Sequence, residues 1–125
     1  MRPRRNPGSG GERGAVTAEL ALCLPVLMAV TVGLVWLLSV GAAQVRTVDA
    51  ARETARAVAR GDDVGTAVAV GERVAPEGVT VRVSTEGDRV VAHAAGRVPG
   101  PGGLFGFLPG ADVEAEAVAL AEQAP

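Results

Sequence analysis

Residues 15–45 read AVTAELALCLPVLMAVTVGLVWLLSVGAAQV, and this stretch decides the fold of the chain. It holds one charged residue, Glu19, and the 26 residues from Leu20 to Val45 carry no charge. As a helix these 26 residues would be about 39 Å long at about 1.5 Å per residue, whereas the hydrocarbon core of a bilayer is about 30 Å thick. The stretch therefore predicts one membrane-spanning helix.

Two other interpretations of this stretch are weaker. A buried core helix would need apolar surroundings, but the rest of the 125 residues is rich in Ala, Val and Gly, and the whole chain has three aromatic residues (Trp36, Phe105 and Phe107). A cleaved secretory signal has an apolar region of about 7–15 residues, and this one is about twice as long.

The preceding residues 1–14 read MRPRRNPGSGGERG and are basic, with four Arg and one Glu. Their Gly, Pro and charge content predicts a leader without structure. Positive charge on this flank predicts that residues 1–14 lie in the cytoplasm and that the C-terminus lies outside.

The composition argues against several functions. A single Cys excludes an internal disulfide, and one Cys with one His argues against a zinc site. Residues 15–125 hold eight Arg and thirteen Asp or Glu, a net charge of -5, so nucleic-acid binding has little support. No nucleophile–base pair, cofactor motif or small-molecule site stands out.

Glu19 is costly in a spanning helix, although the dipole at a helix start favours a negative charge. It is the fifth residue after Gly14, which closes the basic leader. This register resembles the processing site of type IV prepilins. The resemblance implies that a prepilin peptidase cuts between Gly14 and Ala15. It also implies that Glu19 then pairs with the new N-terminal amine of a neighbouring subunit.

The run RGAVTAELALCLPVL, residues 13–27, is similar to the TadE-like minor pilins and pseudopilins of tight-adherence (Flp) pilus systems. Pro25 inside the apolar helix is typical of pilin helices and is expected to bend the axis. Leu20 follows Glu19, where Flp major pilins typically have Tyr. Major pilins are also much shorter, and both differences favour a minor component.

Beyond residue 45 the helix is expected to continue to Arg60, with Gly61 as its C-cap. Its apolar positions recur at steps of three and four: Val45, Val48, Ala51, Ala55 and Val58. Asp62 or Asp63 can then cap a second helix that ends near Val74.

Alternating apolar and polar residues predict strands at 79–84 and 89–98, joined by a turn at 86–88. Residues 111–122 are ambiguous because Ala and Glu favour a helix, but their apolar residues recur at period two. We predict a third strand there, as the TadE-like resemblance implies. His93 falls on the polar face of its strand without a partner that would make it a catalytic base.

Residues 99–110, PGPGGLFGFLPG, are predicted to form a loop because of their Gly and Pro content. Its apolar residues are Leu104, Phe105, Phe107 and Leu108. Two interpretations stay open: the loop fills a small core, or it is an exposed patch that a partner subunit covers.

The predicted fold is α+β: residues 1–14 are a cleaved leader, 15–45 the transmembrane half of a long helix, and 46–125 an extracytoplasmic unit. The predicted function is that of a non-enzymatic minor pilin or pseudopilin in the cell membrane, able to enter a pilus or a related secretion pseudopilus. The implied partners are a prepilin peptidase, other pilin subunits, the inner-membrane assembly platform and membrane lipid. The alternative is an unprocessed single-pass anchor that carries an outer binding module.

Overall fold

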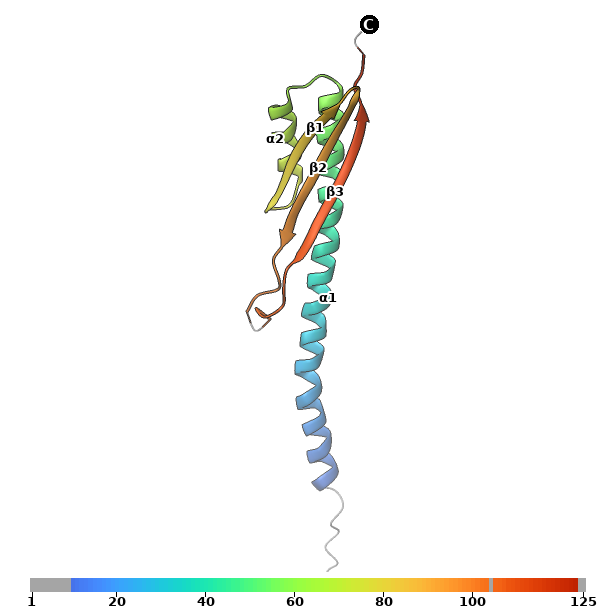
Figure 1. The fold of residues 1–125 in the computed structure, drawn as a ribbon. Helices are drawn as coiled ribbons and strands as arrows, with labels where there is room; N and C mark the ends of the chain where they lie inside the picture. The colour runs from blue at the N-terminus through green and yellow to red at the C-terminus, as the bar shows by residue number, and fades with distance from the viewer. Residues whose placement is uncertain (1–9, 104, 124–125) are drawn as a thin grey trace, which may run out of the picture. The chain divides into compact units, whose positions relative to one another are not determined.

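The computed structural model describes residues 10–103 and 105–123. Its elements are the helices α1 (Gly10–Ala59) and α2 (Val64–Val74) and the strands β1 (Val79–Glu86), β2 (Arg89–Val98) and β3 (Ala111–Leu120), as Figure 1 shows. The predicted α+β class, with a long apolar helix, a short helix and a three-stranded antiparallel sheet, is confirmed. The chain divides into two compact units, Met1–Val35 and Trp36–Pro125, and α1 contributes to both.

Helix α1 begins at Gly10, five residues before the predicted start at Ala15, so the last part of the predicted leader is helical. Glu12 lies in the first turn, where the helix dipole favours a negative charge. The helix ends at Ala59, and Gly61 follows with a positive φ of 97°. The backbone N–H of Gly61 donates to Val58 O (3.0 Å) and that of Asp62 to Ala57 O (3.1 Å), which confirms the predicted glycine C-cap.

Helix α2 has an N-cap and a stop that its sequence predicts. Asp63 is the cap, because its Oδ2 accepts a hydrogen bond from the backbone N–H of Thr66 (3.1 Å). The helix ends at Val74, and the chain is extended at Ala75, directly before Pro76. The predicted end near Val74 is confirmed.

The sheet is an antiparallel meander in the order β1-β2-β3. In its middle, Ala94 of β2 pairs with Val81 of β1 and with Ala115 of β3. The ambiguous segment after the loop is the strand β3, so its period-two pattern outweighs the helix propensity of Ala and Glu.

The second unit, residues 36–125, is called the outer unit here after the side of the membrane that the sequence predicts for it, and its buried core consists of Ala, Thr and Val side chains. The buried side chains of α1 are Ala43, Thr47, Ala50, Ala51, Thr54, Ala55, Ala57 and Ala59. The stripe correctly predicted that the helix continues beyond residue 45, but its members differ in burial: Ala51 and Ala55 are buried, whereas Val45 is 61% exposed. The physical reason is close approach, because a Cβ at Gly71 of α2 would overlap Thr54 Oγ1. Because α2 packs so closely against α1, only small side chains of α1 fit between the two helices.

Candidate functional site

The residues of the predicted processing and pairing site lie in the first turns of α1. Gly14 and Ala15 are exposed and helical, and beyond the adjoining backbone of the helix no atom lies within 4 Å of a Cβ built on Gly14. Thr17 donates its hydroxyl to the Arg13 carbonyl (2.9 Å), which spans the Gly14–Ala15 bond. The bond that a peptidase would cut is thus held in a helical turn in this structure.

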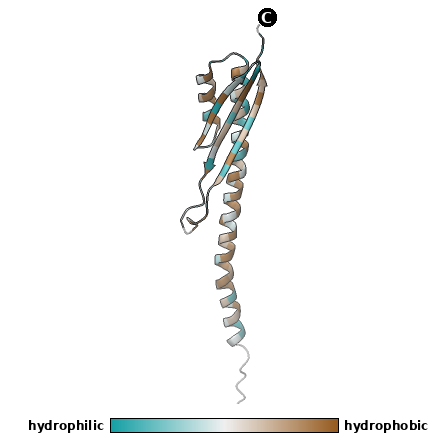
Figure 2. Cartoon of the chain, viewed as in Figure 1, coloured by the Kyte–Doolittle hydropathy of each residue, from teal (hydrophilic) through white to brown (hydrophobic). Residues whose placement is uncertain are grey.

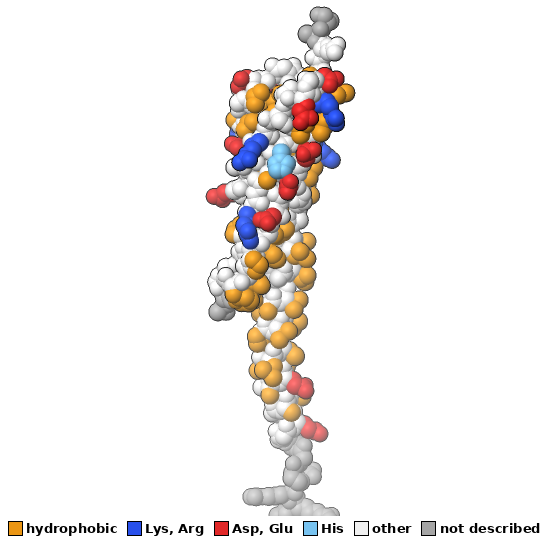
Figure 3. All heavy atoms as spheres, in the orientation of Figure 1, with side chains coloured by type: hydrophobic (Ala, Val, Ile, Leu, Met, Phe, Trp, Pro, Cys, Tyr) orange, Lys and Arg blue, Asp and Glu red, His pale blue; other side chains and the backbone are white. Residues whose placement is uncertain are grey.

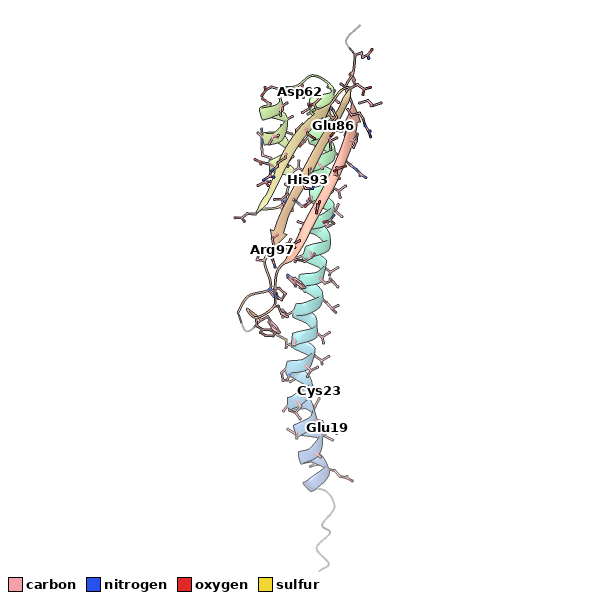
Figure 4. The ribbon with its side chains drawn as sticks, viewed as in Figure 1. Glu19, Cys23, Asp62, Glu86, His93 and Arg97 are labelled. Carbon is pink, nitrogen blue, oxygen red and sulfur yellow. The ribbon has the colours of Figure 1, made fainter. Side chains whose placement is uncertain are left out.

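Glu19 is exposed on α1, and its side chain projects away from the helix (Figure 4). Large apolar side chains around it are exposed too, among them Leu20, Leu22, Leu24 and Leu27. Figure 2 shows apolar residues along this part of α1. Within the described residues α1 is the one helix long and apolar enough to cross a membrane, and none of its most apolar stretch is buried. A helix of this kind is consistent with a single-pass membrane anchor.

Pro25 lies inside α1, and the helix continues through it. Proline has no backbone N–H, so the carbonyl of Ala21 lacks its usual helical donor there. The bend expected at Pro25 stays a prediction.

The loop residues differ in exposure. Phe107 is 78% exposed and Leu108 36%, whereas Phe105 is half-buried; Leu104 lies outside the described residues. Phe107 therefore does not fill a core. Backbone N–H groups inside the loop donate from Phe105 to Gly102 O (3.0 Å) and from Leu108 to Phe105 O (2.9 Å).

Charged side chains gather on the exposed face of the sheet, as Figure 3 shows. His93 Nε2 lies 2.7 Å from Glu114 Oε1, and Arg97 Nη1 lies 3.6 Å from Asp112 Oδ1, all with exposed or partly exposed side chains. Sequence reasoning found no partner for His93, because Glu114 is 21 residues away and meets it only through strand pairing. Among the described residues no cluster of three His, Cys, Asp or Glu could hold a metal ion.

Within the outer unit, two residues of α1 that the sequence pattern did not single out attach β3 and the end of α2 to the helix. Gln44 exchanges two hydrogen bonds with the backbone of Glu114 in β3: its Nε2 donates to Glu114 O (2.8 Å) and its Oε1 accepts from Glu114 N (3.3 Å). Arg46 donates from Nε to Val74 O and from Nη2 to Ala75 O, both at 3.2 Å. Arg46 thus satisfies carbonyls at the C-terminus of α2, where the dipole favours a cation.

The fold defines a class of protein, a small α+β chain whose N-terminal helix is apolar enough to anchor it in a membrane. The family described as TadE-like protein matches residues 14–56, which lie within α1 and include its apolar segment. A protein of Mycobacterium tuberculosis named apoptosis inhibitor Rv3655c is 36% identical over 104 residues, which are 83% of this chain and 77% of the relative. The chain belongs to the TadE-like family. No solved structure was found to match it.

Proposed function

We propose that this chain is a minor pilin or pseudopilin that helps to assemble a tight-adherence, type IV-like pilus or a related secretion system. The observation that carries the proposal is the register of Gly14, Ala15 and Glu19 at the start of an exposed apolar helix in a TadE-like chain. In this account residues 1–14 are cytoplasmic and removed, 15–45 anchor the chain, and 46–125 lie outside. The subunit is structural and carries out no catalysis.

The processing step is compatible with the helical start of α1. Gly10, Gly11 and Gly14 lie in the first turns, and each is about 1 kcal/mol less favourable in a helix than Ala. Helix ends also fray. A prepilin peptidase can therefore unwind this end at a small free-energy cost and reach the bond between Gly14 and Ala15.

The role of Glu19 follows from the cost of its charge. A carboxylate costs about 2.5–3.5 kcal/mol at the centre of a spanning helix and less near the interface. The helix dipole stabilises a negative charge near the helix start by only about 0.3–1 kcal/mol, which is less than this cost. After the cut, the first basic side chain of the mature chain is Arg46, about 40 Å away along a helix. The amine of a neighbouring subunit, freed at its Ala15, is a cation that can reach Glu19 in an assembly.

The test compares Glu19→Gln and Glu19→Ala with the wild type in cells that build the pilus. Both variants are expected to insert and to be cleaved, because the membrane tolerates their neutral side chains better. Both are expected to be absent from purified pili and from the complexes with other pilin subunits that chemical crosslinking captures. Pro25→Ala is a control within the same helix that leaves the charge in place. Normal incorporation of both Glu19 variants would remove Glu19 as the pairing residue.

The name of the relative gives a specific reason to keep a second candidate. That protein is called an apoptosis inhibitor, a name that describes an effect on a cellular process rather than assembly. The corresponding proposal here is an unprocessed membrane anchor whose outer unit binds another protein. In that case residues 1–14 stay attached and Glu19 is dispensable, so the same variants separate the two candidates.

A further inference from the structure

The loop between β2 and β3, residues 99–110, lies at the end of the outer unit where α1 enters it (Figure 1). Trp36, the first residue of this unit, donates its Nε1–H to the carbonyl of Pro99 (3.1 Å). The opposite end of the sheet is tied to the far end of α1, where Glu122 N–H donates to Ala59 O (2.9 Å). The loop is therefore beside the part of α1 that leads directly into the apolar segment.

The surface at this end is apolar and uncharged. The loop has no charged residue, and its Phe107 and Leu108 side chains are exposed. Leu37 and Leu38, which follow Trp36 on α1, are exposed as well. In Figure 3 the apolar side chains of the loop contrast with the charged ones over the strands. The last charges before the loop are Arg97 and Asp112, which pair across its stem.

Trp36, which the loop contacts, lies near the expected outer end of the membrane-spanning segment by count along the sequence. About 20 helical residues cross the hydrocarbon core. Counted from Leu20, directly after Glu19, they end at Ser39, so Trp36 lies within one turn of the hydrocarbon boundary, and residues 40–45 of the anchor pass through the headgroup region. Tryptophan is enriched at this depth because its ring is apolar and its N–H is polar.

From these observations we propose that Phe107 and Leu108 of this loop rest in the lipid surface of the outer leaflet and attach the outer unit to it. The occupant is lipid because the loop continues the uncharged surface of a helix that already needs a membrane. The internal turns of the loop satisfy part of its backbone, as a segment near hydrocarbon requires. This inference rests on the proposed membrane anchorage and not on pilus assembly.

The test uses the full chain in dilute vesicles of phosphatidylethanolamine and phosphatidylglycerol, with a nitroxide spin label at one of three positions. The first label is on the native Cys23, in the apolar part of α1. The other two use Phe107→Cys in the loop and Ser84→Cys on the exposed face of β1, each with Cys23→Ala. Electron paramagnetic resonance then measures collisions of the label with oxygen, which concentrates in lipid, and with a water-soluble nickel chelate.

The expected result is that labels at positions 23 and 107 collide more with oxygen, whereas the label at position 84 collides more with the chelate. If position 23 reports lipid and position 107 reports water, the loop inference fails and the anchor stands. If position 23 also reports water, the anchorage fails with it. If position 107 is shielded from both reagents, and the shielding decreases when the protein is diluted in lipid, a neighbouring subunit covers the loop and the lipid assignment is wrong.

Discussion

The side-chain amide of Gln44 in α1 forms hydrogen bonds with both backbone groups of Glu114 in β3: it donates to the carbonyl (2.8 Å) and accepts from the N–H (3.3 Å). It therefore pairs with the edge of the sheet as a residue of a further strand would. An open strand edge is a site of unwanted pairing with other chains, and here a side chain of the helix occupies part of it. The contact also fixes the position of β3 along α1.

Loss of this contact should weaken the outer unit. Gln44→Ala removes two hydrogen bonds, but water can reach the exposed Glu114, so we expect a loss of about 1 kcal/mol. Thermal unfolding of the full chain in detergent, followed by circular dichroism, measures it. Gln123→Ala, at the exposed second glutamine, is the matched control and should change nothing. Equal melting of the two variants would show that the pairing contributes no stability.

A side chain at Gly71 should separate α2 from α1. Its Cβ would overlap the Oγ1 of Thr54, whose hydroxyl is buried and donates to Ala50 O (2.9 Å). Gly71→Ala is expected to destabilise the outer unit by about 1–3 kcal/mol. Gly41→Ala, where nothing lies within 4 Å of the new Cβ, should be neutral or slightly stabilising.

Thr54→Ala offers a check on the cause of the Gly71→Ala effect. It removes the oxygen that the new methyl group would meet. The double variant should therefore be more stable than the sum of the two single changes predicts, measured by the same melting curves. Strict additivity would mean that the two side chains do not compete for the same space.

Neighbouring aspartates before α2 should differ in their effect on stability. Asp63 caps the helix, so Asp63→Ala is expected to cost about 1 kcal/mol. Asp62 instead forms an exposed ion pair with Arg60 (3.7 Å), and Asp62→Ala should cost less than about 0.5 kcal/mol. The midpoints of thermal unfolding of the two variants measure this difference. A larger loss of stability for Asp62→Ala than for Asp63→Ala would contradict the assignment of Asp63 as the cap.

Much of this fold could be predicted because its signals are local. The glycine C-cap at Gly61, the aspartate before α2 and the alternation in residues 79–98 each act over a few residues. The face of α1 that is buried could not be predicted from periodicity, because Val45 and Ala43 fit helical stripes equally well. Close packing of Gly71 against Thr54 selects the stripe of small residues, and that contact joins distant segments.

The same limit applies to the candidate site. Gly14, Ala15 and Glu19 could be predicted because a processing site is read from a short sequence register. The contact of Trp36 with Pro99 joins residues 63 positions apart and has no sequence signal. The apolar residues of the loop could be found in the sequence, but their position beside the membrane end of the outer unit required the fold.

A change at Gly14 should prevent processing. Gly14→Val places a branched side chain at a position where a small residue suits the cut, so the unprocessed chain is expected to accumulate in cells with an active prepilin peptidase. Gly11→Val, three residues earlier in the same exposed turns, is the control and should still be cleaved. Immunoblots of membrane fractions separate the two forms by the mass of fourteen residues. Cleavage of Gly14→Val at the wild-type rate would contradict the assignment.

The mature N-terminus is the most direct test of the account. Mass spectrometry of the intact wild-type chain, isolated from cells with an active prepilin peptidase, reads it in one measurement. A chain that begins at Ala15, with Glu19 as its fifth residue, is the result expected of a pilin-type subunit. A chain that still carries Met1, or Arg2 after removal of the methionine, would contradict the account and favour the unprocessed membrane-anchored binding module.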